Sequence, residues 1–489
     1  MDLNKLLKEA GVKTSLYLSP SLINKISCDS RDVESNDLFV SVHGPNSFIY
    51  AQSALEKGAK VFISNQETCE HFERSFPDVT FIPVSNPRLT FTKLVQVIYP
   101  GQPQTIIAVT GTNGKSSVVN MLRQLWEFTG IPAASLGTLG LTLSSNAQFN
   151  QNKIIPNLTS LGPVDFHQTL QSLKENHIDH IAVEASSHGL DQYRIHGARL
   201  SAAAFTNLTQ DHLEYHKTLE NYFNAKTKLF SEVLPNGNSA IINADSPYFQ
   251  KLVEICRKKN HMVISYSLMQ KANFFAKNIQ QNHHAIQFDL IVYNEIFPKQ
   301  TVNLAGIFQL ENLLCALALA HATGIPISSM IPSLPLLKSA KGRMEYVASK
   351  NGAPVFVDYA HTPDALECVL KNLRPHVKGN LWVVFGCGGN RDTGKRPQMG
   401  KIAQDLADKI IVTDDNPRLE DPASIRSEIL KACPKAKEIG NRAEAIAVAI
   451  AGLSKDDILL IAGKGHESGQ TVGTVTYHFS DQDEVLKHL

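Results

Sequence analysis

Two adjoining segments decide the fold of this chain: the apolar run Ile106-Ile107-Ala108-Val109 and the loop Thr110-Gly111-Thr112-Asn113-Gly114-Lys115-Ser116. With the amphipathic stretch that follows to about Phe128, they indicate a buried strand, a glycine turn and a helix. In this order, backbone N–H groups and a helix N-terminus converge on one point, where a polyphosphate is well stabilised. A lysine there balances charge and a hydroxyl reaches Mg²⁺. The stretch therefore predicts an α/β fold with a phosphate site.

The loop departs from the common P-loop spacing at one position, because glycine is expected at 109 and this chain has Val109. A helix-capping turn with an incidental lysine is the alternative interpretation. The order of strand, two glycines, Lys-Ser and helix argues against it. We therefore expect a variant nucleotide loop, with ATP contacts from Gly111, Thr112, Asn113, Gly114, Lys115, Ser116 and Ser117.

Length and composition bound the remaining possibilities. The 489 residues exceed what one core holds, and at roughly 150 residues per domain they suggest three domains. The 47 basic and 46 acidic residues give a net charge of +1, which argues against a nucleic-acid or membrane surface. The seven scattered cysteines form no C-x-x-C pair, and no apolar run approaches a membrane span. We expect a cytoplasmic, reduced protein with no nucleic-acid partner and no membrane span.

The pattern of apolar runs changes twice along the chain. Short strand-like runs and a turn-rich segment at 99–103 precede the phosphate loop. Buried strands alternating with helices follow it and predict a mostly parallel sheet; apolar–polar alternation over 276–304 predicts antiparallel strands at one edge. After 332–335 the strand–helix rhythm restarts. The predicted strands lie at 37–42, 60–63, 80–84, 106–109, 181–183, 202–205, 240–242, 355–357, 381–385, 409–412 and 458–461.

Two further segments of the middle region carry groups that suit metal chemistry. Glu184 ends a buried strand, where a carboxylate beside a phosphate loop is well placed for Mg²⁺; a surface glutamate is the alternative. His212 and His216 lie four residues apart, a spacing that suggests zinc. Because Glu214 is misplaced for an H-E-x-x-H site, we reject a zinc protease.

The segment Asp415-Asn416-Pro417-Arg418 follows the last third's strand at 409–412. A rigid proline turn before an arginine aims a planar guanidinium, which suits a carboxylate. Asp-Asn-Pro is also a common turn, so the segment alone leaves both interpretations open. The nearby Gly386-Cys387-Gly388-Gly389 is weak as a dinucleotide fingerprint, since Arg391 stands where the third glycine is expected.

The loop at 110–117, TGTNGKSS, resembles that of the Mur ligases, which build the peptide stem of peptidoglycan, and of the related folylpolyglutamate synthases. The similarity extends through most of the chain. It implies an α/β protein of three domains: an N-terminal UDP-sugar-binding domain at 1–101, a central P-loop ATPase with a mostly parallel sheet at 102–335, and a C-terminal Rossmann-like domain at 336–489.

The resemblance assigns catalytic and metal roles to Lys115, Glu184, His212 and Lys226. It implies two Mg²⁺ ions, with Ser116, Glu184, His212 and a carbamate on Lys226 as ligands. CO₂ turns a lysine amine into a carboxylate-like oxygen ligand. A helical lysine is usually solvated, so sequence chemistry alone does not single out Lys226, and Lys228 is the alternative position.

The same resemblance implies contacts to ATP outside the loop. Asn312 matches the adenine-contacting segment at 306–312, although Gln309 and Glu311 depart from the family pattern. Arg343 matches a phosphate contact and Asp358 a ribose contact, both from the third domain. Domain closure would then complete the site and exclude water.

Contacts to a UDP-N-acetylmuramoyl dipeptide are implied at Ser30, Asn157, Leu158, Thr159, Ser186, Gln192 and Arg194. Two segments depart from the family here. Residues 44–48 (GPNSF) replace a D-G-H element, and residues 157–160 (NLTS) replace Asn-Thr-Thr-Pro.

The quartet at 415–418 resembles the signature of the family members that add meso-diaminopimelate. That amino acid has a second amino-acid centre at its far end, so lysine would leave Arg418 without a carboxylate. The implied diaminopimelate contacts are Arg391, Asp415, Asn416, Pro417, Arg418, Gly463 and Glu467.

We therefore expect an ATP-dependent ligase of peptidoglycan precursor synthesis, acting as a monomer on small-molecule substrates. It would phosphorylate the D-glutamyl side-chain carboxylate of UDP-N-acetylmuramoyl-L-alanyl-D-glutamate and transfer the acyl group to meso-diaminopimelate. The alternatives are an L-lysine-adding sister ligase, a folylpolyglutamate-synthase-like ligase, and a P-loop binding switch without ligase chemistry.

Overall fold

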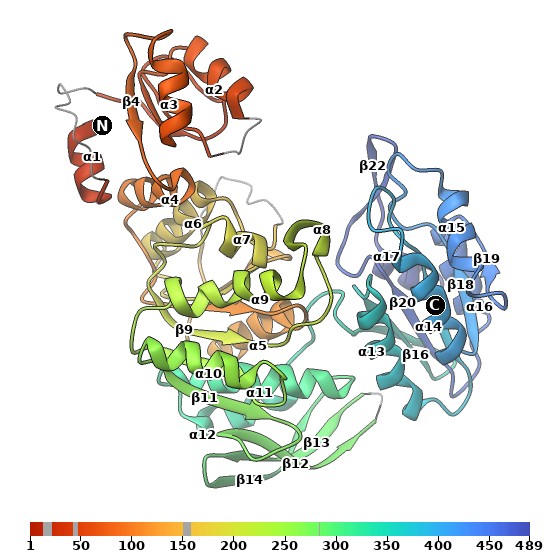
Figure 1. Cartoon of the computed structure of the whole chain (residues 1–489). Helices are drawn as coiled ribbons and strands as arrows, with labels where there is room; N and C mark the ends of the chain where they lie inside the picture. The colour runs from red at the N-terminus through yellow and green to blue at the C-terminus, as the bar shows by residue number, and fades with distance from the viewer. Residues whose placement is uncertain (13–21, 43–46, 150–157, 283) are drawn as a thin grey trace. The chain divides into compact units, whose positions relative to one another are not determined.

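The computed structural model describes residues 1–12, 22–42, 47–149, 158–282 and 284–489 (Figure 1). Within them the strands form sheets of four, ten, six and two strands, with helices between. This confirms the mixed α/β class. The chain packs into two compact units. Unit 1 comprises Met1–Ala108, Pro132–Ser201 and Ala225–Asn238; unit 2 comprises Val109–Ile131, Ala202–Asn224 and Ser239–Leu489. The domain boundaries 1–101, 102–335 and 336–489 stay a prediction.

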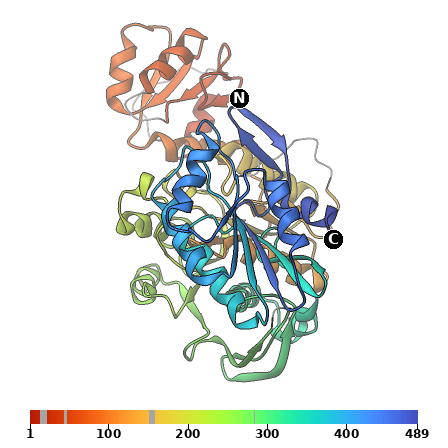
Figure 2. The same ribbon diagram turned by 90° about the vertical axis from the view of Figure 1, so that its right-hand side faces the viewer.

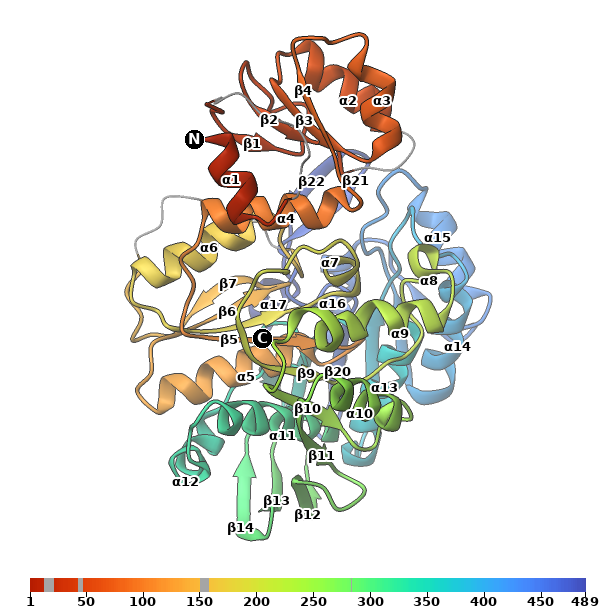
Figure 3. The same ribbon diagram turned by 60° about the vertical axis from the view of Figure 1, so that its left-hand side comes forward.

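The N-terminal sheet is fully parallel, in the order β1-β2-β3-β4. Its strands alternate their buried side chains between two faces: Leu38 and Val40 contribute to one core, and Phe39 to the other. Helices α1 and α4 cover the first face, and α2 and α3 the second (Figure 3). The elements are β1 (Ile26–Ser27), β2 (Leu38–Val40), β3 (Val61–Ser64), β4 (Thr80–Pro83), α1 (Leu3–Glu9), α2 (Ser47–Glu56), α3 (Gln66–Glu73) and α4 (Pro87–Ile98).

The ten-stranded sheet has the order β14-β13-β12-β11-β10-β9-β5-β8-β6-β7. Its parallel strands β9, β10 and β11 continue into the antiparallel strands β12–β14, which lie at one edge as the alternation over 276–304 predicts (Figure 1). Its strands are β5 (Thr105–Thr110), β6 (Ala133–Gly137), β7 (Gly140–Leu143), β8 (His180–Glu184), β9 (Leu200–Phe205), β10 (Ser239–Asn243), β11 (Met262–Ser267), β12 (Phe274–Gln281), β13 (Ile286–Val292) and β14 (Glu295–Val302).

The helices that follow these strands bury apolar faces against the sheet. α5 packs against α11, and both are buried along most of their length. The helices of this region are α5 (Lys115–Phe128), α6 (Pro163–Glu175), α7 (Ser187–Asp191), α8 (Leu213–His216), α9 (Leu219–Lys228), α10 (Phe249–Lys258), α11 (Ile307–Ala322) and α12 (Ile327–Met330). None of the helices in the described part of the chain combines the length and apolar character needed to cross a bilayer.

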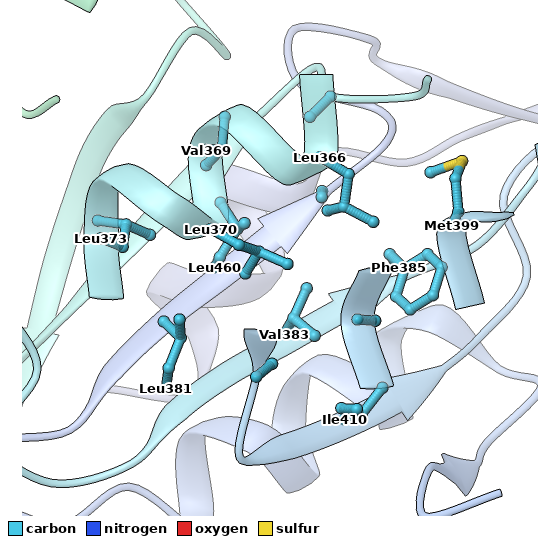
Figure 4. Packing of buried hydrophobic residues seen from close by; sticks show 14 of the residues in the cluster. Leu366, Val369, Leu370, Leu373, Leu381, Val383, Phe385, Met399, Ile410 and Leu460 are labelled. Carbon is cyan, nitrogen blue, oxygen red and sulfur yellow. The ribbon is translucent and has the colours of Figure 1, made fainter. Parts of the chain in front are cut away.

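The six-stranded sheet, in the order β15-β16-β20-β17-β18-β19, is parallel except for its edge strand β15. Helices cover both faces (Figure 2), which is the doubly wound arrangement expected of a Rossmann-like domain. On one face Leu366 and Leu370 pack onto Val383 and Leu460 (Figure 4). The strands are β15 (Glu345–Lys350), β16 (Ala353–Asp358), β17 (Leu381–Phe385), β18 (Lys409–Val412), β19 (Lys437–Glu438) and β20 (Ile458–Ala462).

A separate two-stranded hairpin, β21 (Gly469–Val472) and β22 (Val475–His478), follows this sheet. Neither the hairpin nor β15 is predicted from the sequence, because neither has the buried apolar run that marks the parallel strands. The helices of this region are α13 (Pro363–Leu373), α14 (Lys395–Leu406), α15 (Pro422–Leu430), α16 (Arg442–Ala451) and α17 (Asp481–Lys487).

Candidate active site

The phosphate loop lies between β5 and α5, as predicted, and two of its glycines are fixed by close contacts. Gly111 has a φ of +146°, and a Cβ there would lie 1.9 Å from Oγ1 of Thr206. Gly114 has a φ of +87°, and its Cβ would lie 2.4 Å from Oδ1 of Asn312. Both positions therefore exclude larger residues, since the backbone conformation and the space each require glycine.

A second loop, directly after β9, holds the phosphate loop in place. Thr206 Oγ1 donates to the carbonyl of Asn113 at 2.6 Å, and the Asn113 N–H donates to Oδ1 of Asn207 at 2.9 Å. The Thr112 N–H donates to the carbonyl of Asn207 at 2.9 Å. These hydrogen bonds hold the loop in a defined conformation, as a pre-organised anion site requires.

The cations at the loop are Lys115 and Arg343. The Lys115 amine donates to the carbonyls of Gly111, at 2.9 Å, and Thr112, at 2.8 Å, so it is held over its own loop. Nη2 of Arg343 lies 3.3 Å from Oγ of Ser116, at the first turn of α5. Two positive groups and a helix N-terminus therefore converge where a polyphosphate is expected.

The segment around Arg343 is fastened by Gln309 and Asp358. Nε2 of Gln309 donates to the Arg343 carbonyl at 3.1 Å, so this departure from the family pattern has a structural role. The Asp358 carboxylate accepts from the N–H groups of Met344, at 2.6 Å, and Ala360, at 2.7 Å. Burial raises the pKa of Asp358. Unit 2 thus brings Ser116, Asn312, Arg343 and Asp358 together around the loop.

The predicted ligand His212 and the nearby His216 differ sharply in their surroundings. His212 is partly exposed and has a left-handed φ of 54°. Its ring nitrogens lie 3.4 Å from Glu214 and 3.5 Å from Asp211. His216 is buried against Tyr222, at 5.0 Å between ring centroids, and so belongs to the core. His212 is therefore the better placed of the two for a ligand, although no group of three His, Cys, Asp or Glu gathers in metal-binding geometry among the described residues.

In unit 1, Glu184 lies at the end of β8 and its side chain is buried. Its carboxylate accepts from the Thr138 N–H at 2.9 Å and from Thr138 Oγ1 at 3.2 Å. The same hydroxyl is 2.9 Å from Oγ1 of Thr159. A buried carboxylate with polar partners is compatible with a cation ligand and argues against a simple surface glutamate.

Ser160 is the centre of the neighbouring network. Its hydroxyl donates to the Glu184 carbonyl and accepts from the Ser186 N–H, each at 3.0 Å. Its carbonyl accepts from Nη1 of Arg194 at 2.9 Å, and Oε1 of Gln192 accepts from Nη2 of Arg194 at 2.7 Å. The predicted substrate residues Thr159, Ser186, Gln192 and Arg194 are therefore gathered around Glu184 in one unit.

The structure distinguishes the two candidate lysines of α9. Lys226 is 1% exposed, although lysines of this kind are usually solvated. The amine of Lys228 instead pairs with Asp191 at 2.8 Å and lies over the Tyr193 ring. Lys228 is thus already committed to a surface ion pair, whereas Lys226 is in the interior.

The remaining predicted UDP-substrate residues are less informative. Ser30 is buried, and its carbonyl accepts from the Lys57 amine at 2.9 Å. Leu158 is 49% exposed, and Asn157 lies outside the described residues. Residues 44–46, within the segment that replaces the family's D-G-H element, are also outside them.

The segment Asp415-Asn416-Pro417-Arg418, here called the acceptor quartet, is held by the hairpin β21–β22. The Arg418 N–H donates to the Thr471 carbonyl at 3.1 Å, and the Gly473 N–H donates to the Arg418 carbonyl at 2.7 Å. Arg418 has a φ of 53° and its Nη1 donates to the Gly389 carbonyl at 2.8 Å. Its Nε and Nη2 make no hydrogen bond within the described part of the chain. The Nε–Nη2 edge of the guanidinium thus stays open to a ligand.

The glycines after β17 allow this loop to approach the quartet. A Cβ on Gly386 would lie 2.2 Å from the Thr413 carbonyl oxygen, and one on Gly389 only 1.9 Å from that of Pro417. Gly388 would approach Nη1 of Arg418 to 2.9 Å. Close loop packing therefore explains these glycines, and no dinucleotide fingerprint is needed.

A third loop, directly after β20, also contacts the quartet at 415–418. Gly463 has a φ of +113°, and its Cβ would lie 2.8 Å from Oδ2 of Asp415. Oε2 of Glu467 accepts from Nδ2 of Asn416 at 2.8 Å. Asp415, Asn416, Pro417, Arg418, Gly463 and Glu467 are thus brought together. Arg391 is exposed and makes no ion pair within the described residues.

Comparisons with known proteins agree with this geometry. Residues 109–320 match the Mur ligase middle domain, and residues 342–465 match the domain described as "Mur ligase, glutamate ligase domain". Two proteins named UDP-N-acetylmuramoyl-L-alanyl-D-glutamate--2,6-diaminopimelate ligase are similar along the chain. That of Brucella melitensis is 43% identical and that of Rhizobium meliloti 44%, each over 96% of this chain and 94% of the relative.

The chain belongs to the Mur ligase family. Its enzyme class, an ATP-dependent amide ligase, and its three-domain α/β class are thereby confirmed.

Solved structures support the family fold. A structure titled as the 2,6-diaminopimelate ligase aligns with a TM-score of 0.67 and 32% identity, over 99% of this chain and 98% of that one. MurF from Acinetobacter baumannii aligns at 0.60 with 18% identity, over 94% and 95%. Folylpolyglutamate synthase from Mycobacterium tuberculosis aligns at 0.59 with 15% identity, over 76% and 91%. The last two, at these identities, show the fold alone.

Sequence reasoning missed several residues that shape this Mur ligase site. Thr206 and Asn207 hold the phosphate loop, and the polar run that begins at the end of β9 is the signal that could have identified them. Thr138 and Ser160 organise the Glu184 network. Thr138 gives no sequence signal, because its partners are 21 and 46 residues away.

Proposed function

We propose that this Mur ligase joins meso-2,6-diaminopimelate to the D-glutamyl side-chain carboxylate of UDP-N-acetylmuramoyl-L-alanyl-D-glutamate, driven by ATP. The observation that carries the proposal is that one acceptor site contains both the Arg418 guanidinium and the Glu467 carboxylate, each hydrogen-bonded to Asn416. The far end of diaminopimelate bears one carboxylate and one ammonium, so it needs both charges. The names of relatives 43% and 44% identical support the same substrates.

The first chemical step is phosphoryl transfer. An oxygen of the D-glutamyl carboxylate attacks the γ-phosphorus of ATP, the bond to the β-phosphate oxygen breaks, and ADP leaves. Lys115, the loop N–H groups and Arg343 stabilise the charge that develops on the transferred group. The product is an acyl phosphate, whose lifetime depends on excluding water.

The second step forms the amide. An amine of diaminopimelate attacks the acyl carbon, the carbon–oxygen bond to phosphate breaks, and inorganic phosphate leaves while the nitrogen loses a proton. Arg391, Asp415, Asn416, Pro417, Arg418, Gly463 and Glu467 are the proposed acceptor contacts. Lysine lacks the far carboxylate, so it would leave a desolvated Arg418 edge unpaired, which costs several kcal/mol or about 10⁴-fold in the most stringent cases.

Mg²⁺ is general for the family, and we propose two ions here. Ser116, Glu184, His212 and a carbamate on Lys226 would hold them. The burial of Glu184 and Lys226 fits this assignment, because a buried amine is costly as a cation and a carbamate would supply oxygen instead. When bound, Mg²⁺ supplies positive charge that neutralises the phosphate oxygens.

The remaining assignments follow the family pattern. We propose that Asn312 contacts adenine, Arg343 phosphate and Asp358 ribose. Ser30, Asn157, Leu158, Thr159, Ser186, Gln192 and Arg194 would bind the UDP-linked dipeptide. We further propose that the enzyme acts as a monomer in the cytoplasm, in peptidoglycan precursor synthesis.

Release of inorganic phosphate, measured with each substrate omitted in turn, tests the proposal. We expect release only when ATP, Mg²⁺, the UDP-linked dipeptide and meso-diaminopimelate are all present. Release without the UDP-linked dipeptide, or with a folate substrate and glutamate in its place, would contradict the substrate assignment. ATP binding without release under any combination would indicate a binding switch.

A further inference from the structure

Lys464 is a fully buried lysine inside the acceptor site, and it has no part in the two chemical steps of the proposed function. Its side chain is 0% exposed. Its amine donates to Oδ1 of Asn416 and to Oε2 of Glu467, each at 3.1 Å. One buried cation therefore joins two of the residues that are expected to meet the acceptor.

The loop after β20 places this lysine inward. Gly463 and Gly465 flank it with φ values of +113° and +55°, conformations that L side chains rarely adopt. A Cβ on Gly465 would lie 2.7 Å from the Tyr359 side chain. A buried ammonium is costly unless it is paired and hydrogen-bonded, and Asn416 and Glu467 supply those partners.

The Lys464 amine determines the orientation of the Asn416 side-chain amide. Oδ1 of Asn416 accepts from Lys464 and also from the Thr471 N–H at 2.9 Å. Neither an ammonium nor a backbone N–H can accept a hydrogen bond, so the oxygen must face both. Nδ2 consequently faces Glu467, to which it donates at 2.8 Å. The Asn416 side chain can therefore offer the bound amino acid only one group, the second N–H of its amide.

The Lys464 amine also gives the two carboxylate oxygens of Glu467 different surroundings. Oε2 accepts from both Lys464 and Asn416. Oε1 has no partner among the residues that the structure describes, and the Glu467 side chain is 31% exposed. Lys464 thus leaves one defined carboxylate oxygen for the ammonium of a ligand.

We propose that Lys464 is a positioning residue for the acceptor: it fixes Glu467 and Asn416 in the orientation that receives the far amino-acid centre of diaminopimelate. The proposal rests on the proposed function, since it concerns the same site. Lys464 does not touch the reacting atoms. Its removal should therefore weaken acceptor binding and leave the ATP site unchanged.

The test is Lys464→Met, which keeps the length and removes the charge, assayed by phosphate release. We expect the KM for diaminopimelate to rise roughly 10- to 100-fold, because misplaced binding groups cost that much. The KM values for ATP and the UDP-linked dipeptide should stay within about twofold. Lys487→Met is the matched control: Lys487 also pairs with a glutamate three residues away, Glu484 at 2.7 Å, but on the outside of α17. It should change none of the three KM values.

A double-mutant cycle with Glu467→Gln shows whether Lys464 acts through Glu467. If it does, Lys464→Met should cost less than about threefold in the Glu467→Gln background, since the two effects are coupled. An equal loss in both backgrounds, or an unchanged KM for diaminopimelate in Lys464→Met alone, would overturn the proposal. Lys464→Gln replaces Lys464→Met if the latter does not fold.

The controls distinguish failure of the proposed function from failure of the role proposed for Lys464. A wild-type enzyme that releases no phosphate with diaminopimelate overturns the proposed function, and the role of Lys464 with it. A wild-type enzyme that works beside a Lys464 variant with unchanged acceptor KM overturns the role of Lys464 alone. If neither Lys464 variant folds, as judged by thermal unfolding, the residue is structural and the proposal falls.

Discussion

The phosphate loop and the acceptor site hold their principal cations in different ways. The Lys115 amine bonds to carbonyls only four and three residues before it, within the same turn. The Arg418 guanidinium bonds to the carbonyl of Gly389, 29 residues away, and its backbone is tied to the hairpin β21–β22. The phosphate loop holds its lysine within one turn before a helix, whereas the acceptor site holds its arginine between three loops and a hairpin.

The difference shows how a ligase family can keep its chemistry and change its substrate. The phosphate loop tolerates little variation, because a Cβ on Gly111 or Gly114 would lie within 2.5 Å of a side-chain oxygen of Thr206 or Asn312. An assembled site can be altered loop by loop without disturbing the phosphate loop. Changes in the two regions should therefore affect different kinetic parameters.

The largest effect is expected at the phosphate loop. Lys115→Ala should lower kcat for phosphate release roughly 10³-fold, because it removes a charge that stabilises the transferring phosphoryl group. Diaminopimelate binding, measured by calorimetry, should be nearly unchanged. A kcat within tenfold of wild type would show that the loop does not carry the phosphoryl chemistry.

The next effect is expected at Arg418. Arg418→Ala should raise the KM for diaminopimelate about 100-fold, since one partner of a desolvated charge pair is lost, while the KM for ATP stays constant. Arg391→Ala should have a smaller effect, because Arg391 is exposed. Equal losses for the two variants would argue against the pre-positioned geometry of Arg418.

A smaller effect is expected where one loop meets another. Gly389→Ala places a Cβ 1.9 Å from the Pro417 carbonyl oxygen, so the quartet must move. We expect about a tenfold rise in the KM for diaminopimelate. Gly394→Ala is the control, because its Cβ would meet only the Asp392 side chain, at 3.2 Å. A neutral Gly389→Ala variant would show that the loops do not position each other.

The smallest effect concerns pH. Burial lowers the pKa values of His361 and His466 to about 4, beside Tyr359 near the acceptor loops. The unfolded chain protonates these rings near pH 6.5. The free energy of unfolding should therefore fall as pH drops from about 6.5 to 4, by less than about 1.4 kcal/mol per pH unit for each ring.

Thermal unfolding across that pH range measures this effect, and His466→Gln should reduce the slope. A slope that is the same in wild type and in His466→Gln would contradict the assignment to this histidine. At neutral pH neither ring is charged, so the titration of these two rings should not affect phosphate release there.

Much of the fold could be predicted from the sequence where its cause is local. Continuous apolar runs predict the buried strands, and the glycines that follow one such run predict the phosphate loop. β15 and the hairpin β21–β22 could not be found this way, because their side chains are half-buried or exposed and form no continuous buried run. The hairpin nonetheless fixes Arg418, so a weak strand signal can hide a functional element.

The candidate site follows the same division. The residues of the loop at 110–117 were identified from the order of residue types alone. Lys226 required the family resemblance, since only packing reveals that its side chain is buried. The sequence does not single out Lys464 as a site residue, because a lysine between two glycines is typical of a solvated loop. Its two partners lie 48 and three residues away, in a contact that only the fold creates.

The central claim is that the assembled acceptor site selects the amino acid that is joined to the carboxylate activated at the phosphate loop. A competition reaction tests it most directly: equal concentrations of meso-diaminopimelate and L-lysine, with ATP and the UDP-linked dipeptide, followed by mass analysis of the product. We expect the product that carries diaminopimelate to exceed the product that carries lysine by roughly 100 to 1. Comparable amounts of the two products would contradict it.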